Sequence, residues 1–287
     1  MAGRASLLLA LGPLALGCAG PSQVSFVSNE RPNTYNAQGA PPPAAAHAEN
    51  PNGRVELPDD DELVEPERPL ADSRQERALV HIHTPEGTTG SGVVLGPRVV
   101  ATAQQCVKGE PPGASEPGPN RTYRVEVPSS ALTWTNRAVK YVVRPGCEWT
   151  ELDIGILVLG EPVEWVQPLR IISAPNTGAK VQALGFGHCA GEPRGWKDRV
   201  GIVRSRVSET IVIDVPLCRG DVGGPVVDGR DGDIVGLISR RDDPEGSPLR
   251  TTTIVRLDTT HARDLLAQAK QLADGADPKT LQPAGCR

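Results

Sequence analysis

The chain has 287 residues, a formal net charge of −5 at pH 7, and 38% hydrophobic residues, of which few are aromatic. That length holds one domain of ordinary size with appendages, or two small domains. The acidic balance argues against general nucleic-acid binding, which needs a basic face to neutralise phosphates. Because aromatic residues make up only 3% of the chain, its core must be built from Val, Leu, Ile and Ala.

The N-terminus is typical of an export signal. Residues 1–17 contain one arginine and a short apolar run that ends in small residues, which fits a signal peptide and is too short for a transmembrane helix. The ending "LALGC" is similar to a bacterial lipobox, in which Cys18 would be acylated and become the mature N-terminus. Residues 15–17 also fit an ordinary signal-peptidase site. We therefore expect an exported protein, periplasmic or cell-surface, with a lipid tether or in a secreted soluble form.

The next segment, residues 18–72, predicts a disordered tether. It contains "GAPPPAAAHAENPNG" and "PDDDELVEPERP", and such proline-, alanine- and acid-rich sequence cannot bury enough apolar surface to offset chain entropy. A flexible chain of this length spans roughly 40 Å from its anchor to the following domain. The acidic run at 59–62 is expected to be a solvated spacer.

From residue 78 the hydrophobic period changes to two. "ALVHIHT" (78–84) places Val80 and Ile82 on one strand face and His81 and His83 on the other. Two histidines on one face could chelate a metal ion, but the sequence places no third ligand beside them. They are therefore predicted to be solvent-facing, and we expect neither a metal nor a cofactor.

Further segments of strand pattern form two sets, separated by a connector at 161–172 that carries two prolines. Short strands at this spacing, punctuated by Gly and Pro, predict an all-β barrel or sandwich. The first set lies at 91–96, 98–103, 123–127, 140–145 and 153–160, and the second at 180–187, 199–208, 210–216, 224–228, 233–239 and 252–257.

A single helix is predicted near the end of the chain, at 260–273. Its apolar residues recur with helical spacing and form one stripe. Thr260 is the expected N-cap and Gly275 the stop, and a polar tail at 274–287 follows. The stripe consists of Ala262, Leu265, Leu266, Ala269 and Leu272.

Three stretches of the chain carry recognisable motifs: "GSGVVLGPRVVATAQQCV" (90–107), "DIGILVL" (153–159) and "CRGDVGGPVV" (218–227). They resemble three motifs of the trypsin-like serine proteases. The first is similar to the strand–turn–strand that ends in Thr-Ala-Ala-His-Cys, the second to the family's Asp-Ile-Ala-Leu-Leu-Leu-type strand, and the third to its Cys-x-Gly-Asp-Ser-Gly-Gly-Pro loop. The resemblance implies two antiparallel β-barrels and a C-terminal helix in a domain at 73–273. Barrel one would occupy about 76–160 and barrel two about 168–258.

The resemblance also shows which catalytic side chains are missing. The family's acyl transfer needs a hydroxyl nucleophile, an imidazole base and a carboxylate that orients the base. The carboxylate is present as Asp153, but the imidazole position holds Gln105 and the nucleophile position holds Val222. An amide is not a useful proton acceptor near neutral pH, and an isopropyl group cannot attack a carbonyl. We therefore expect a pseudoprotease in which the Gln105 amide donates a hydrogen bond to Asp153.

The loop that carries Val222 keeps its structural residues. By the same resemblance, the backbone N–H groups of Gly220 and Val222 correspond to the oxyanion hole. Asp221 corresponds to a residue that pairs with a new N-terminal amine in zymogen-activated relatives. No Arg-Ile-Val-Gly-Gly-type activation site precedes residue 78, so activation by such a cut is not expected.

The substrate cleft also departs from the family pattern. Pro216 occupies the floor of the primary specificity pocket, where trypsin-like preference would need an Asp. Ser239, Arg240 and Arg241 replace the usual Ser-Trp-Gly along the pocket edge, and Arg241 is expected to project into the pocket. No trypsin-like primary preference is carried over.

Export makes disulfide bonds possible for the five cysteines that follow Cys18. Proximity in the implied fold favours the pairs Cys106–Cys147 and Cys189–Cys218. Cys286, in the tail, is then the expected unpaired thiol.

The leading functional hypothesis is an inactive protease fold that serves as a tethered binding or scaffold module. Its ligand would be an unknown protein or peptide in or near the old cleft, with Arg240 and Arg241 as contacts for an acidic group. The alternatives are an active serine-type endopeptidase with an unusual catalytic set, and a purely structural envelope component. No nucleic-acid partner is expected, and the membrane would be reached only through a lipid on Cys18.

Overall fold

A computed structural model provides the structure. All of the described residues belong to one compact unit. The predicted signal peptide, Cys18, the tether, Cys189, Cys286 and the side chain of Arg241 lie outside the described part. Within that part, no helix combines the length and apolar character needed to cross a membrane. The described ranges are 73–128, 134–148, 152–164, 166–188, 197–218, 220–241 and 251–284.

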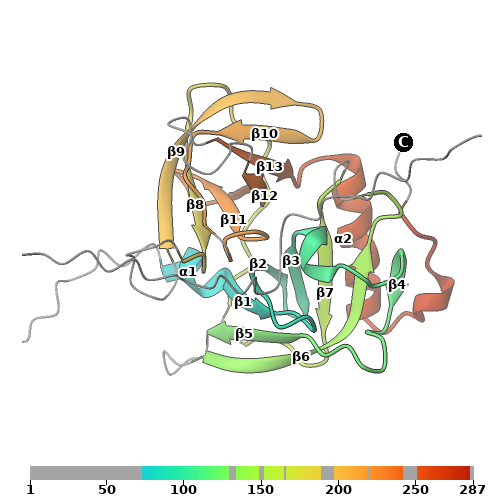
Figure 1. The fold of residues 1–287 in the computed structure, drawn as a ribbon. Helices are drawn as coiled ribbons and strands as arrows, with labels where there is room; N and C mark the ends of the chain where they lie inside the picture. Colours follow the sequence, from blue (N-terminus) through green and yellow to red (C-terminus); the bar gives the residue numbers. More distant parts are fainter. Residues whose placement is uncertain are drawn as a thin grey trace, which may run out of the picture. The chain divides into compact units, whose positions relative to one another are not determined.

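The first half of the unit is a closed antiparallel barrel (Figure 1). Its strands follow the order β6-β5-β1-β2-β3-β7, and pairing of β6 with β7 closes the circle. A short strand, β4 (Gly113–Ser115), adds to β6. The alternating residues predicted for the first strand behave as expected, since Val80 and Ile82 lie fully buried inside. The six barrel strands are β1 (Leu79–His83), β2 (Thr89–Gly96), β3 (Val99–Thr102), β5 (Arg124–Pro128), β6 (Trp134–Arg144) and β7 (Gly155–Leu159).

The second half is a second closed barrel, in the order β10-β13-β12-β11-β8-β9. Aliphatic side chains from all around it fill its interior, including Val203, Ile213 and Ile254. A further core cluster joins Val93 and Ile156 of barrel one to Leu237 of barrel two and to the C-terminal helix. The strands are β8 (Lys180–Gly185), β9 (Lys197–Val207), β10 (Thr210–Ile213), β11 (Pro225–Asp228), β12 (Ile234–Arg241) and β13 (Thr252–Arg256).

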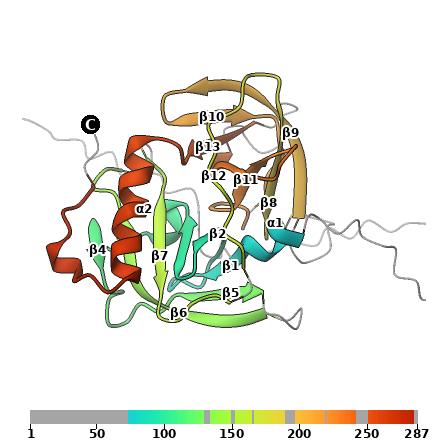
Figure 2. The ribbon, with the colours of Figure 1, turned by 180° about the vertical axis from the view of Figure 1, so that it is seen from behind.

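The C-terminal helix α2 (Thr260–Ala273) has the predicted bounds and buries the predicted stripe. Although it follows barrel two in the chain, it packs on β6 and β7 of barrel one (Figure 2). The predicted N-cap was one residue late: Thr259 has the extended backbone of a cap, and its hydroxyl accepts from the N–H of Ala262. Gly275, at φ 101°, ends the helix as expected.

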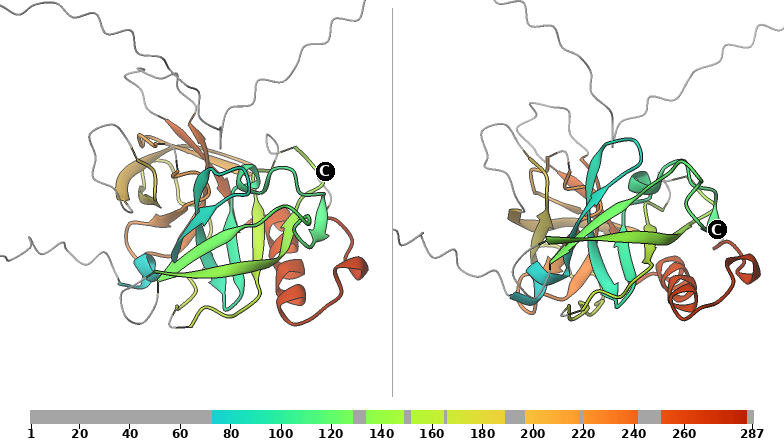
Figure 3. Two further views of the ribbon diagram at one scale, coloured as in Figure 1. Left: turned by 60° about the horizontal axis from the view of Figure 1, so that its bottom comes forward. Right: turned by 90° about the horizontal axis from the view of Figure 1, so that it is seen from below.

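A second helix, α1 (Ser73–Ala78), precedes β1 and was not predicted. It is too short to show a helical period in the sequence. It packs against β1, β2 and β5 of barrel one and also reaches barrel two: Gln75 is buried beside Gly232, and Arg74 Nη2 donates to Asp233 Oδ1 at 2.9 Å. Figure 3 shows α1 at the start of the described chain, ahead of β1. The segment that enters barrel one is therefore fastened to barrel two.

Two further differences concern barrel one and the tail. Strand β6 begins at Trp134, well before the predicted 140–145 segment, because its outer part alternates between half-buried and exposed residues. The missed strand β4 is only three residues long. Two short 3₁₀ segments, η2 (Gln104–Val107) and η3 (Pro278–Thr280), were also unforeseen, and the first of them carries Gln105.

Candidate functional site

The three positions that matter for catalysis come from three separate elements. Gln105 lies in η2 directly after β3, Asp153 precedes β7, and Val222 lies in the loop before β11. Gly223, at φ 87°, lets that loop approach barrel one. A β-carbon on Gly223 would lie 2.2 Å from Thr102 Oγ1, so only glycine fits there. The loop is therefore packed against the segment that leads into Gln105.

Gln105, Asp153 and Ser239 form a buried hydrogen-bonded group. Gln105 Nε2 donates to Asp153 Oδ2 at 2.7 Å and to the Ser239 carbonyl at 3.1 Å, and its backbone N–H donates to Asp153 Oδ1 at 3.2 Å. The Ser239 hydroxyl donates to Asp153 Oδ2 at 2.7 Å. The predicted contact between Gln105 and Asp153 is thus confirmed. Both hydrogens of the Gln105 amide nitrogen have acceptors.

The sequence placed Ser239 only at the edge of the cleft, yet its hydroxyl is turned onto Asp153. The pairing of β12 with β13 shifts register between Ile238 and Arg240, which leaves Ser239 as the extra residue of a bulge. A bulge re-aims the side chain that it carries. A register shift of this kind has no signature in the local sequence.

Burial dominates the electrostatics of Asp153. Its side chain is removed from water, and this desolvation raises its pKa to about 6, although the hydrogen bonds from Ser239 and Gln105 act in the opposite direction. The carboxylate is therefore mostly ionised at neutral pH and needs every donor that it has. An amide nitrogen that donates both hydrogens stabilises this charge but cannot accept a proton.

Val222 is half-buried, and Ser91 ties its loop to barrel one. Ser91 N donates to the Val222 carbonyl at 2.9 Å, and the Ser91 hydroxyl donates to the Gly220 carbonyl at 2.6 Å. The same hydroxyl accepts from Phe186 N at 2.9 Å. Cys106 Sγ lies 3.8 Å from the Val222 carbonyl. Ser91 thus holds the loop that carries the expected oxyanion groups through the carbonyls of both Gly220 and Val222.

Asp221, which the sequence left without a partner, is fully buried and strongly bound. Its carboxylate accepts from the backbone N–H of Gly187 at 2.7 Å and of Cys218 at 2.9 Å. Arg199 Nη1, from β9, donates at 3.0 Å to Oδ2, the oxygen that also accepts from Cys218 N, whereas Gly187 N donates to Oδ1. A β-carbon on Gly187 would lie 2.2 Å from the carboxyl carbon, which explains the glycine there. Arg199 was missed because nothing local links it to position 221.

The other expected cleft residues are described in part. Pro216 is half-buried and Arg240 is exposed. Arg241 is the last residue of β12, but its side chain lies outside the described part, so its projection into the pocket stays a prediction.

The expected disulfide between Cys106 and Cys147 is wrong. Cys106 is buried in η2 and takes no part in a disulfide. Cys147 and Cys218 each take part in a disulfide. Cys106 instead packs against Gly90, where a β-carbon would lie only 2.7 Å from its sulfur. Cys189 and Cys286 lie outside the described residues, so the Cys189–Cys218 pair and an unpaired Cys286 are untested.

Two closed antiparallel barrels with a C-terminal helix define the chymotrypsin-like fold, as the resemblance implied. The chain belongs to the trypsin-like peptidase family: the family model described as "Trypsin-like peptidase domain" matches residues 90–237. No curated protein sequence matches the chain.

Two solved structures are similar. Mouse brain neuropsin, a serine protease, is 18% identical with a TM-score of 0.53, over 69% of this chain and 96% of its own. The scabies mite inactivated protease paralogue S-D1 is 15% identical with a TM-score of 0.55, over 73% of this chain and 96% of its own. At these identities the likeness shows the fold alone.

Proposed function

We propose that this chain is a catalytically inactive member of the trypsin-like peptidase family. The observation that carries the proposal is the hydrogen-bonded group of Gln105, Asp153 and Ser239, in which an amide occupies the place of the base. The facing loop presents Val222, which has no nucleophilic atom. Without nucleophile and base, binding and the oxyanion hole together leave roughly 10³–10⁴-fold acceleration over water. For an amide bond that is no useful activity.

The contacts that hold the framework of the site are nevertheless present. Asp221 is fully paired, the loop is fastened by Ser91, and Asp153 retains its donors. Such a framework suits a binding or scaffold module. The same fold occurs in a scabies mite protein described as an inactivated protease paralogue. This supports the view that the fold can persist without protease activity.

The ligand of this module would be a protein or peptide at the old cleft, and Arg240 is an exposed cationic contact there. The expected export and the lipid on Cys18 would place the module at the bacterial periplasmic face or the cell surface. A tether of 18–72 would let it reach partners away from the membrane.

Peptidase assays on a broad peptide library test the loss of activity. The natural protein is compared with the Gln105→His/Val222→Ser double variant, and Gln105→His alone serves as the control with a base but no nucleophile. We expect no cleavage by the natural protein or by the control. Activity of the double variant alone would show a framework disabled at two side chains, and silence throughout would show a remodelled cleft.

Cleavage by the natural protein would contradict the proposal. It would favour the alternative, an endopeptidase with an unusual catalytic set. Activity that survives Val222→Ala would then locate the nucleophile elsewhere.

Affinity capture from the cognate cell envelope tests the binding role. The natural protein should retain a partner that Arg240→Glu loses, whereas Arg263→Glu, an exposed charge change on α2, should leave capture intact. Recovery only by the denatured chain would refute a folded binding module.

A further inference from the structure

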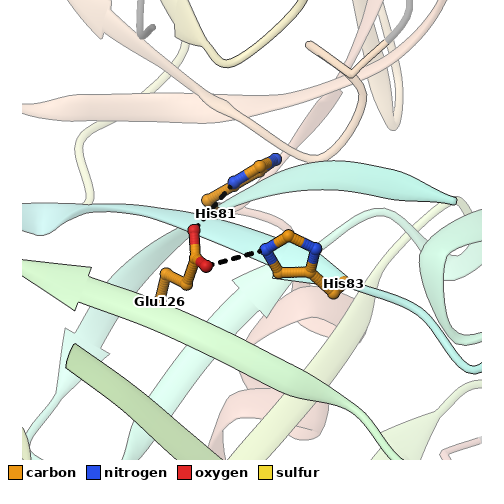
Figure 4. Close-up of side chains that lie close together, drawn as sticks. All are labelled: His81, His83 and Glu126. Atoms are coloured by element: carbon orange, nitrogen blue, oxygen red, sulfur yellow. Dashed lines mark hydrogen bonds and ion pairs between the residues drawn. The ribbon is translucent and has the colours of Figure 1, made fainter. Parts of the chain in front are cut away.

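We propose that His81, His83 and Glu126 form a binding site for a divalent transition-metal ion, with Zn²⁺ as the preferred ion. The site joins β1 to β5 on the outside of barrel one (Figure 4). It is separate from the group around Asp153. Within the described residues, this is the one set of three or more His, Cys, Asp or Glu side chains that could hold a metal ion.

The register of the sheet brings the three side chains together. His81 lies directly opposite Glu126 in the β1–β5 pairing, and His83 lies two residues further along the same face of β1. The inner face of β1 holds Val80 and Ile82, so the histidines point away from the barrel interior. Glu126 is the third ligand that the sequence could not place, because it comes from a strand far along the chain.

The interatomic distances suit one ion held by all three groups. His81 Nδ1 lies 3.1 Å from Glu126 Oε2, and His83 Nε2 lies 3.1 Å from Glu126 Oε1. All three ligand groups offer atoms within 4.8 Å of one another. A tetrahedral Zn²⁺ with ligands at 2.0–2.2 Å separates its ligand atoms by ~3.4 Å. Binding therefore needs only small side-chain movements.

One ligand atom is buried beside the carboxylate. His83 Nε2 is enclosed by protein and lies 3.1 Å from Glu126 Oε1, as an ion pair whose angle is poor for a hydrogen bond. Buried polar atoms ordinarily have a well-aligned partner. Coordination to a metal ion would give this nitrogen and the carboxylate a shared partner.

The surroundings hold the ligands in place. The His81 ring stacks on Phe186, with ring centroids 4.6 Å apart, and Trp134 meets Phe186 edge-on at 5.3 Å. Such an apolar shell fixes the orientation of a ligand and limits access of water. The histidines lie on the outer face of β1, as predicted from the sequence, but the side chains of His81 and His83 are only 21% and 27% exposed.

The positive charge of Arg124 disfavours a bound cation. Arg124 Nη2 lies 3.9 Å from Glu126 Oε1, but its side chain is 54% exposed and can turn to solvent. Two imidazoles and one carboxylate leave a fourth position for water or for a group from a partner. This ligand set favours Zn²⁺ and its neighbours in the first transition row over Ca²⁺ and Mg²⁺, which prefer oxygen ligands.

Calorimetric titration of the full chain with Zn²⁺ alone, after removal of metals with a chelator, tests the site. We expect one tight equivalent, which His83→Gln and Glu126→Gln each weaken by at least about tenfold, since even an outer-shell change costs 10–100-fold. Arg124→Gln should tighten binding. The matched control is His261→Gln, because His261 contacts a single carboxylate, 3.4 Å from Glu209, and should not affect binding.

A second readout keeps the test valid if a variant loses stability. Zn²⁺ should raise the Tm of the natural protein and of His261→Gln, and Cu²⁺ bound at the site should quench the fluorescence of nearby Trp134. Absence of binding to the natural protein would overturn the proposal. Equal binding by His83→Gln and the natural protein would overturn it too, since the ion would then lie elsewhere.

Discussion

Asp153 has two side-chain donors, the Gln105 amide and the Ser239 hydroxyl. Replacing Gln105 by Ala removes one of them and leaves part of a buried charge unsatisfied. We expect Gln105→Ala to lower the free energy of unfolding by about 1–3 kcal/mol at pH 7.5, measured by urea denaturation. An unchanged unfolding midpoint would show that the amide has no structural role.

Gln104 provides the control for this measurement. It is the adjacent buried glutamine, and its Nε2 donates to the Cys147 carbonyl at 2.9 Å, a neutral acceptor. Its Oε1 is buried without a hydrogen-bond partner among the described residues. Truncation to Ala therefore also removes the unfavourable free energy of burying that oxygen. Gln104→Ala should therefore destabilise the protein less than Gln105→Ala.

The raised pKa of Asp153 predicts a pH dependence of stability. Its value of about 6 in the folded protein lies above the unfolded value of 3.8. The resulting stabilisation is fully present below the unfolded pKa and is lost as the pH rises through about 6. Relative to Asp153→Asn, which cannot ionise, the natural protein should lose on the order of 1 kcal/mol between pH 5 and 7.5. Parallel urea-unfolding curves of the two proteins would contradict this.

At the scale of elements, strand β9 carries two arginines that pair with carboxylates in different settings. Arg199 and Asp221 have side chains only 11% and 0% exposed, whereas Arg204 and Asp214 are 60% and 27% exposed. Arg199→Met leaves a buried carboxylate without its cation and should cost roughly 3–5 kcal/mol of unfolding free energy. Arg204→Met, the matched control, should cost at most about 1 kcal/mol. Similar losses in both variants would mean that the buried pair has no special role.

The C-terminal segment predicts which sulfur is joined to Cys147. Gly146 N donates to the Ala284 carbonyl at 3.2 Å, and Ala284 is buried. Residue 286 is two positions further on, at most ~7 Å along an extended chain. We therefore predict a Cys147–Cys286 disulfide, in place of the expected unpaired Cys286. Peptide mapping by mass spectrometry without reduction checks it, and a Cys147 peptide joined to any other cysteine would refute it.

Elements specified by a local sequence pattern could be predicted, whereas features that depend on contacts between distant segments could not. The helix at 260–273 was predicted with its bounds because its apolar stripe is local. Most strands were predicted from their alternating pattern and the triad positions from the motifs, whereas β4 and the outer part of β6 were missed. Arg199, Glu126 and the hydroxyl of Ser239 were missed as partners because each meets its contact across distant strands, through register and bulges that single segments do not encode. The helix α1 was missed because it is short and contacts with distant segments of both barrels hold it.

At the scale of the whole molecule, the proposed attachment rests on one residue outside the described part. Cys18→Ser should abolish metabolic labelling with palmitate and release the protein from the membrane fraction. The change leaves the domain itself untouched, so its Tm should not move. Membrane association that persists in the variant would refute the lipid anchor and leave the ordinary signal peptide as the explanation of export.

The pairing of Arg199 with Asp221 also bears on how the loop before β11 becomes ordered. The cation that fastens the loop before β11 belongs to the same chain and lies near the start of β9. No peptide bond has to be cut to supply it, and the loop reaches its final form during folding. The charge of Asp221 is therefore balanced without a new N-terminal amine, and the order of this loop depends on the folding of barrel two.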